Sequence, residues 1–296
     1  MHIIFVTTFS FFSVSALFAS DLVMEGNRVA GVTGTYDGKP YTFKARCFVG
    51  ADGAGGITAR KVGVVNTYED HLVSALRTYY EGVEGMTDKI ELHFVDESLP
   101  GYFWIFPLPN KKANVGIGMI VTDMKKKKMN LEKLMYEIIE KNPLFKERFA
   151  NAKKSAEVKR WHLPVGSYRP KVYGNGYVLV GDAASLIDPF TGEGIGNGLM
   201  SGKIASEIIL KAFEKGDFSE ATLSEYQTAL YAEVGDELNT SYGLQKWVKY
   251  KFLINLIIDK ASRSSDIRNA ISSALIDPEN QKQFQNPMFY LKALLA

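Results

Sequence analysis

The sequence predicts a mixed α/β protein with two sheet-bearing parts and a helical region after them. Apolar and polar side chains alternate with period two in successive runs between Arg28 and Val121, as they do in strands. A short apolar run at 177–181 is followed by spaced glycines and a long helical pattern, the strand–loop–helix order of an α/β unit. From Leu223 onward the periodicity is helical.

Composition is typical of a globular protein with more than one structural unit. The chain has 296 residues, of which 46% are hydrophobic, enough for a buried core. Its 35 Lys and Arg nearly balance 33 Asp and Glu, so no nucleic-acid partner is expected. Cys47 is the single cysteine and the four histidines are scattered, which predicts neither a disulfide nor a metal site and favours a cytoplasmic location. For Cys47 we favour a small core residue over a redox thiol.

The first twenty residues form an apolar leader that is rich in Phe, Val, Ser and Thr. A secretory signal would have a basic beginning, which this segment lacks, and a membrane anchor would need a more continuous apolar run of about 20 residues. A third interpretation is that the protein's true beginning lies elsewhere. We favour this third interpretation, in which the leader is a replacement or a start artefact.

The strand predictions begin with a β-hairpin. Residues 28–36 form its first strand, a turn follows at 37–40, and the second strand ends at Gly50, just before Ala51-Asp52-Gly53. Short turns join four further strand-like runs, which predicts an antiparallel sheet. These runs are 71–81, 89–95, 101–108 and 113–121.

Two later segments are open to more than one interpretation. A helix is expected over 129–143, which ends at a proline, and the lysines at 125–128 before it are interpreted as a solvated loop, with contact to an anionic membrane surface as the alternative. Residues 247–260 are unusually apolar. We expect neighbouring helices to bury them, and a membrane-facing surface is again the alternative.

The chemistry-bearing segment is GYVLVGDAASLIDPFTGEGIGNGLMSG, residues 176–202. Its strand carries Asp182 to the carboxyl end, where the carboxylate can accept hydrogen bonds from hydroxyl groups. Glycines at 192, 194, 196 and 198 let the backbone approach a flat ligand and leave the first N–H groups of the next helix free to face it. An ordinary crossover would need one capping glycine, so this pattern indicates a ligand site.

These residues resemble the GD motif of flavoproteins with the p-hydroxybenzoate-hydroxylase-type fold. The resemblance implies an FAD cofactor, with Asp182 on the ribityl chain and the segment 188–198 along the isoalloxazine ring. The flavin-contacting residues that it implies here are Gly181, Asp182, Pro189, Gly192, Gly194, Ile195 and Gly196.

Residues 48–63 resemble the DG motif of the same family. Asp52, Gly53 and Arg60 match cofactor-binding positions of the motif, and Gly63 also matches. Gly56 stands where the family usually has serine, which puts the hydrogen bond of that hydroxyl in doubt.

A third motif narrows the family. Residues 102–107 read YFWIFP and resemble the Y-x-W-x-F-P motif of geranylgeranyl reductases, which lines a pocket for a prenyl chain. Alternation places Tyr102, Trp104 and Phe106 on one strand face, and Pro107 completes the motif. A sheet face packed on a core is the plain alternative, and flavin halogenases carry a related Trp-x-x-Pro pattern.

The resemblance implies an FAD-dependent oxidoreductase that transfers hydride from reduced flavin to a C=C bond of a prenyl lipid or another hydrophobic small molecule. It also implies an external electron donor, either NAD(P)H or a ferredoxin-like protein, and no side chain is singled out as the proton donor. A peripheral membrane contact would suit such a substrate. The alternatives are a flavin monooxygenase or halogenase, and a truncated, flavin-free remnant.

One expected motif is absent, because no G-x-G-x-x-G precedes Asp52. The predicted fold is therefore an incomplete Rossmann-like FAD-binding domain with an antiparallel-sheet substrate domain and a C-terminal helical region. The expected boundaries are 1–20 for the leader, 21–65 and 164–215 for the FAD-binding domain, 66–163 for the substrate domain and 216–296 for the helical region.

Overall fold

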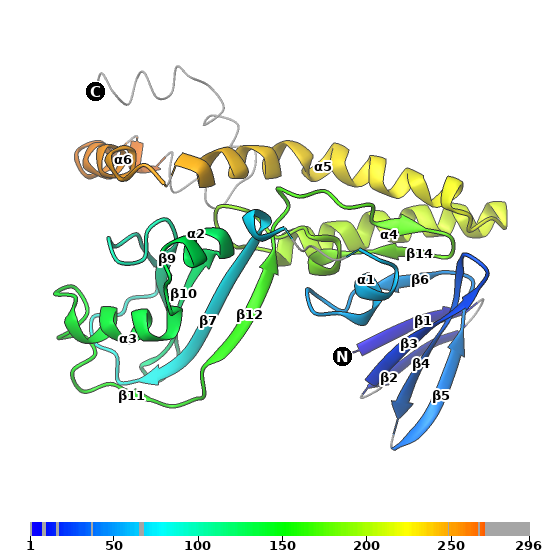
Figure 1. The fold of residues 1–296 in the computed structure, drawn as a ribbon, viewed down its shortest axis with the longest axis horizontal. Coiled ribbons are helices and arrows are strands. Elements are labelled where there is room, and N and C mark those ends of the chain that lie inside the picture. Colours follow the sequence, from blue (N-terminus) through cyan, green and yellow to red (C-terminus); the bar gives the residue numbers. More distant parts are fainter. Residues whose placement is uncertain are drawn as a thin grey trace. The chain divides into compact units, whose positions relative to one another are not determined.

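A computed structural model describes residues 2–7, 10–15, 18–36, 38–64, 68–247, 249–265 and 267–269 (Figure 1). The chain divides into two compact units, each built from two stretches of sequence. Unit 1 comprises Met1–Asn66 and Pro164–Tyr242, and unit 2 comprises Thr67–Leu163 and Gly243–Ala296.

The described residues of unit 1 form three small sheets. The first is the antiparallel pair β1 (His2–Thr7) and β2 (Ser10–Ser15), and the second is β3 (Phe18–Glu25), β4 (Arg28–Tyr36) and β5 (Lys39–Lys44) in that order. The third has the order β13 (Tyr173–Gly174), β14 (Tyr177–Leu179), β6 (Phe48–Gly50). The antiparallel pairing of β4 with β5 confirms the predicted hairpin, with Gly38 at φ 72° in its turn.

The prediction that the second hairpin strand continues to Gly50 is wrong. β5 ends at Lys44, and β6 leaves the hairpin to pair in parallel with β14. The Phe48 N–H donates to the Gly176 carbonyl at 2.8 Å, so this stretch of backbone is hydrogen-bonded to a new partner. Cys47 lies at the break and packs against a hydrophobic core, where burial raises the pKa of its thiol to about 12. The core interpretation of Cys47 is therefore confirmed.

The helices of unit 1 are α1 (Ile57–Lys61), the 3₁₀ turn η2 (Gly181–Ala184), α4 (Ile195–Lys215) and the part of α5 (Glu220–Trp247) that precedes Gly243. The predicted strand–loop–helix order is confirmed. Buried Ile204 and Ile208 of α4 share one core with Leu179 of β14 and with Tyr226 of α5. The Tyr226 hydroxyl donates to the Leu179 carbonyl at 2.8 Å, which ties α5 to the strand that leads into the glycine-rich loop.

Unit 2 is built around one antiparallel sheet with the order β11-β7-β10-β9-β8, and β12 also pairs with β7. The four predicted strand runs and their antiparallel arrangement are confirmed. The strands are β7 (Leu72–Glu81), β8 (Glu91–His93), β9 (Tyr102–Leu108), β10 (Lys112–Ile120), β11 (Lys153–Lys154) and β12 (Lys159–Pro164).

One face of this sheet is a hydrophobic core. Fully buried Phe103, Ile105 and Ile117 pack there with Met135 and Ile138 of α3 (Leu131–Lys141). The Asn130 side chain accepts from the N–H groups of Glu132 and Lys133, so it caps the helix that was predicted in this region. Because side chains alternate along a strand, the opposite sheet face carries Tyr102, Trp104 and Phe106.

The predicted lysine loop is partly helical. Lys125 and Lys126 end α2 (Val121–Lys126), which follows the 3₁₀ turn η1 (Glu69–His71), and Lys125 forms an ion pair with Glu69. The Lys127 ammonium donates to the Leu99 carbonyl at 2.6 Å. The loop prediction is therefore wrong for the first two lysines, because the helix continues from Val121 through them.

Helix α6 (Lys251–Arg263) follows α5 and is held within unit 2 by ion pairs. Lys249, just before it, pairs with Asp123 at 3.0 Å, and Lys251 pairs with Asp96 at 2.6 Å. The apolar side chains of Phe252 and Ile258 are more than half exposed. The expectation that neighbouring helices bury this segment is wrong for these residues. Within the described ranges, no helix combines the length and apolar character needed to cross a membrane.

Candidate functional site

The glycine-rich loop of unit 1 begins where β14 ends. Gly181 has φ 57°, and its N–H donates to the Ser201 hydroxyl of α4 at 3.0 Å. A Cβ atom on Gly181 would lie 3.6 Å from the Gly198 Cα atom, so the turn and the helix approach each other at two glycines. This packing fixes the position of Asp182, the next residue.

The Asp182 carboxylate lies beside the glycines of the loop. Burial raises the pKa of Asp182, and the nearby negative charge of Glu193 raises it further. A Cβ atom on Gly194 would lie 3.2 Å from Asp182 Oδ1, so only glycine leaves this side of the carboxylate open. None of the hydrogen bonds between described residues is made to this carboxylate, which is therefore available to a hydroxyl-bearing ligand.

Asp188 holds the loop together through hydrogen bonds to its backbone, a role that the sequence analysis missed. Its Oδ1 atom accepts from the Phe190 N–H at 2.9 Å, the Thr191 N–H at 2.7 Å and the Thr191 hydroxyl at 2.9 Å. Burial raises the pKa of Asp188, while hydrogen bonds from Ser241, Thr191 and Phe190 act in the opposite direction. The signal was present in the Asp-Pro-Phe-Thr-Gly order, because Asp commonly accepts from N–H groups two and three residues later.

The beginning of α4 differs in part from the prediction. The Gly196 N–H donates to Glu193 Oε1 at 2.8 Å, so the expectation that the first N–H groups are free is wrong for this one. Glu193 caps the helix because its carboxylate is attracted to the positive end of the helix dipole. Ile195 is 79% exposed and Leu199 is 73% exposed one turn later, so an apolar strip flanks the loop.

Glu237 of α5 is a second group that sequence reasoning missed. Burial, followed by the charges of Asp188 and Glu193, raises its pKa to about 6. The residue is partly buried and lies one helical turn before Ser241, which hydrogen-bonds Asp188. No local sequence pattern marks it, since the loop and the helix are more than forty residues apart in the chain.

The structure explains the departure of the DG segment from its family pattern. Asp52 Oδ2 accepts from the Thr58 N–H at 2.8 Å and from the Thr58 hydroxyl at 3.0 Å, so Asp52 caps α1. A Cβ atom on Gly56 would lie 2.2 Å from Asp52 Cγ, so glycine is needed for this arrangement. Gly53 has φ 76°, and Arg60 is exposed.

In unit 2, the aromatic residues of β9 form a continuous row. The Tyr102 and Trp104 ring centroids are 5.9 Å apart, and the Trp104 and Phe106 centroids are 6.0 Å apart. Phe94 extends the row, with its ring 5.8 Å from that of Tyr102. The side chains of this row that come from β9, those of Tyr102, Trp104 and Phe106, are partly buried, and Pro107 follows them on the same strand.

Trp104 lies across the neighbouring strand β10, where glycine makes room for its indole. A Cβ atom on Gly116 would lie 2.2 Å from Trp104 Cζ2, whereas one on Gly118 would lie 3.7 Å from Cζ3. The Trp104 indole N–H donates to Asn114 Oδ1 at 3.1 Å, which fixes the ring orientation. We call the sheet face that carries Tyr102, Trp104, Phe106, Gly116 and Gly118 the aromatic face.

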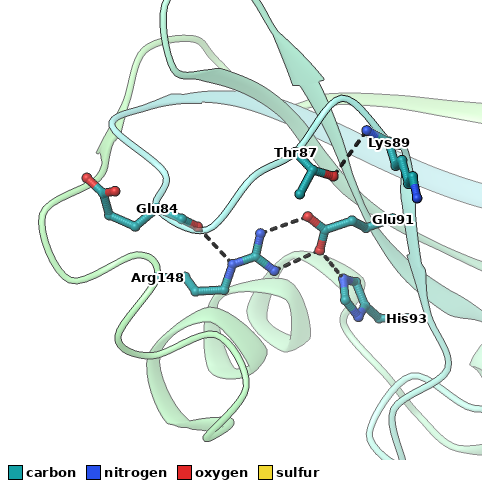
Figure 2. Close-up of polar contacts among 6 residues, drawn as sticks. All are labelled: Glu84, Thr87, Lys89, Glu91, His93 and Arg148. Atoms are coloured by element: carbon teal, nitrogen blue, oxygen red, sulfur yellow. Dashed lines mark hydrogen bonds and ion pairs between the residues drawn. The ribbon is translucent and has the colours of Figure 1, made fainter.

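A cluster of ion pairs supports the edge strand β8 on the core face of the sheet, opposite the aromatic face (Figure 2). Arg148 donates to both carboxylate oxygens of Glu91, at 2.7 and 2.8 Å, and through Nε to the Glu84 carbonyl at 2.9 Å. The His93 Nε2 atom lies 2.8 Å from Glu91, and its ring contacts Phe145 with centroids 4.7 Å apart. This cluster holds β8 beside β9 and thereby supports the aromatic face.

The residues of unit 1 fit the flavin that the resemblance implies. Asp182 offers a carboxylate for ribityl hydroxyls, and Gly192 and Gly194 have no side chains that would stand between the loop backbone and a flat ring. The exposed side chains of Ile195 and Leu199 add apolar area beside it. Pro189 lies in the same loop, between Asp188 and Phe190.

Comparison with known proteins identifies relatives of this chain. Residues 72–156 match the family model described as the geranylgeranyl reductase catalytic domain. Digeranylgeranylglycerophospholipid reductase 2 of Methanococcoides burtonii is 34% identical over 225 residues, which cover 75% of this chain and 53% of that protein. The corresponding enzyme of Methanocella arvoryzae is 31% identical, with 78% of this chain and 57% of the relative covered. The chain thus spans about half the length of these curated relatives.

Solved structures show the same fold. A geranylgeranyl bacteriochlorophyll reductase-like protein from Thermoplasma acidophilum aligns with a TM-score of 0.75 and 23% identity, covering 90% of this chain and 68% of that one. A myxobacterial FAD-dependent halogenase, the chondrochloren halogenase, aligns with a TM-score of 0.58 and 23% identity, covering 75% of this chain and 52% of that one. At this identity the halogenase shares the fold alone, whereas the family model and the curated relatives agree on one family. The chain therefore belongs to the geranylgeranyl reductase family.

Proposed function

We propose that the protein reduces C=C bonds of a prenyl lipid in an FAD-dependent reaction. The aromatic face is the observation that carries this proposal. Its row of rings offers a long apolar surface, which suits an isoprenoid chain, and Gly116 and Asn114 hold the central ring in place. The curated relatives are named for reduction of a digeranylgeranyl glycerophospholipid, a molecule of this class.

Unit 1 would hold the cofactor in this proposal. Asp182 would accept hydrogen bonds from the ribityl hydroxyls, and the residues from Pro189 to Gly196 would border the ring. Asp188 would keep that loop in shape, and Asp52 would hold α1 of the DG segment, where Gly53 and Arg60 also lie. Bound FAD, once reduced, would supply the hydride.

Unit 2 would bind the substrate, with Tyr102, Trp104, Phe106 and Pro107 lining the prenyl pocket. The electron donor would be external, either NAD(P)H or a ferredoxin-like protein. A lipid substrate would also bring the protein to a membrane surface as a peripheral contact. The exposed apolar residues Phe252 and Ile258, near Lys251, support such a contact.

The proposal is tested by incubating the protein with FAD, dithionite and a digeranylgeranyl phospholipid without oxygen, followed by mass spectrometry of the lipid. We expect a gain of about 2 Da for each reduced double bond, because hydride and proton are both added. Trp104→Ala is expected to slow the reaction, whereas Trp161→Ala, at an exposed position of β12, is a matched control. A halogenated or hydroxylated product that forms only with oxygen would contradict the proposal, as would an unchanged lipid in the presence of bound flavin.

A further inference from the structure

The aromatic face does not end at Trp104 but continues across β10 to a cation on β7. Gly116 pairs with Trp104 on one side and with Arg77 on the other, so these three residues lie opposite one another in the sheet. Side chains opposite one another in antiparallel strands lie on the same face. A Cβ atom on Gly118 would lie 3.8 Å from Ala75 Cβ of β7 and 3.7 Å from Trp104 Cζ3 of β9, which supports this placement because Ala75 and Arg77 are two residues apart.

The distance between the cation and the aromatic row is short. Neighbouring strands lie about 4.8 Å apart, so the backbones of Trp104 and Arg77 are separated by about 10 Å. Gly116 has no side chain to fill this interval, and the Trp104 indole extends into it. An apolar chain lying on the Trp104 indole, over β10, would therefore pass one strand away from the guanidinium group.

Arg77 differs from the other partly buried arginines in its partners. Arg28 donates to the Arg46 carbonyl at 2.7 Å, and Arg148 makes the bidentate ion pair with Glu91. Among the described residues, the contact found for Arg77 is with the Tyr79 ring, whose centroid is 4.8 Å from the Arg77 Cζ atom, and no carboxylate pairs with it. A partly buried charge without an anion is unfavourable, because desolvation is not offset by an ion pair.

We infer that Arg77 binds the phosphate group of the prenyl lipid whose chains lie on the aromatic face. This inference rests on the proposed function and adds the charged end of the substrate to it. A guanidinium group has five N–H donors in one plane and matches two phosphate oxygens at once. Contact with the Tyr79 ring holds the guanidinium group and leaves those donors for the phosphate.

Two anion sources share this chemistry, namely a lipid headgroup and a free phosphate or pyrophosphate, and a binding experiment distinguishes them. The probes are digeranylgeranylglyceryl phosphate and digeranylgeranylglycerol, which have the same chains but differ in the phosphate, each dissolved in nonionic micelles. Inorganic pyrophosphate is the third probe. Binding is followed by tryptophan fluorescence, because Trp104, Trp161 and Trp247 all belong to unit 2.

We expect the wild-type protein to bind the phosphate lipid about 10- to 100-fold more tightly than the neutral lipid, as a charge-assisted hydrogen-bonded pair would give. Arg77→Gln should bring this ratio close to one and leave neutral-lipid affinity unchanged, and Arg77→Lys should keep part of the preference. Arg160→Gln is the matched control, because it removes the same charge from β12, where Arg160 already pairs with Glu132.

The outcomes separate this inference from the proposed function. If both lipids bind and Arg77→Gln keeps the wild-type preference, the role of Arg77 is contradicted and the prenyl site stands. If neither lipid binds the wild-type protein, the proposed function itself fails. If pyrophosphate alone binds in an Arg77-dependent way, the anion is not the lipid headgroup and the inference is overturned.

Discussion

The glycine-rich loop of unit 1 and the aromatic face of unit 2 are built in different ways. Within residues 181–201, Asp188, Glu193 and Ser201 each hydrogen-bond to backbone atoms at most twenty residues away. The aromatic face needs three strands, because Trp104 depends on Asn114 and Gly116 of β10 and lies across β10 from Arg77 of β7. A site formed within one segment can be recognised in the sequence as a motif, whereas a site formed across several strands depends on how those strands pair.

The largest effect on the free energy of unfolding is expected when the packing of the aromatic face is disturbed. In Gly116→Ala the new methyl group would lie 2.2 Å from the Trp104 ring and 2.4 Å from the Leu76 carbonyl oxygen. We expect a loss of about 3 kcal/mol in the free energy of unfolding, since the backbone oxygen is held in the sheet. Urea unfolding followed by tryptophan fluorescence measures it.

The matched control for this prediction is Gly118→Ala, on the same strand and face. Its methyl group would make only ordinary contacts, the nearest at 3.5 Å from Val73, so we expect a change below about 1 kcal/mol. Equal stabilities of the two variants would show that Trp104 is not seated on Gly116 as described.

A smaller effect is expected at the ion-pair cluster that braces β8. In Arg148→Met, Glu91 keeps its charge in a partly buried place without its bidentate partner, and we expect a loss of about 2 kcal/mol. Lys141→Met removes an exposed helical ion pair with Glu137 and should cost less than about 0.5 kcal/mol.

The same cluster predicts a dependence on pH. The hydrogen bond from Arg148 and then that from His93 lower the pKa of Glu91 below its ordinary value of 4.5, against the opposing effect of burial. Ionised Glu91 therefore contributes to the free energy of unfolding above pH 4.5, and this contribution is lost as pH falls through the lowered pKa. Urea unfolding between pH 3 and 7 should show a weaker acid dependence in Arg148→Met. An identical acid dependence in both proteins would contradict the role of this ion pair.

The smallest effect concerns the glycine-rich loop. The pKa of Glu237 is raised to about 6, so the stability associated with its protonated form is present below pH 4.5 and is lost as pH rises through 6. Glu237→Gln should therefore be more stable than wild type by about 1 kcal/mol at pH 8, with allowance for partial exposure, and equal to it at pH 4.5. Calorimetry at both pH values measures this. Glu233→Gln, exposed one turn earlier, should change little, and the same gain there would contradict the link to Asp188.

Sequence periodicity and motifs predict most of the elements, and they mark the segments in which both candidate sites lie. The strands of unit 2 alternate clearly, and the glycine spacing at 192–198 marks the loop before α4. The break after Lys44 could not be predicted, because β6 is defined by its distant partner β14. Arg77, Gly116 and Glu237 were also missed, since each acquires its role from a residue on another strand or helix.

The most direct test of the central claim is a titration of the purified chain with FAD, followed by flavin absorbance and fluorescence quenching. We predict saturable FAD binding. Asp182→Ala should weaken the affinity about 10- to 100-fold, because the variant lacks the carboxylate that would accept hydrogen bonds from the ribityl chain. Asp217→Ala, at an exposed carboxylate after α4, is the control and should bind as wild type. Absence of flavin binding, or equal affinity in Asp182→Ala, would contradict the account.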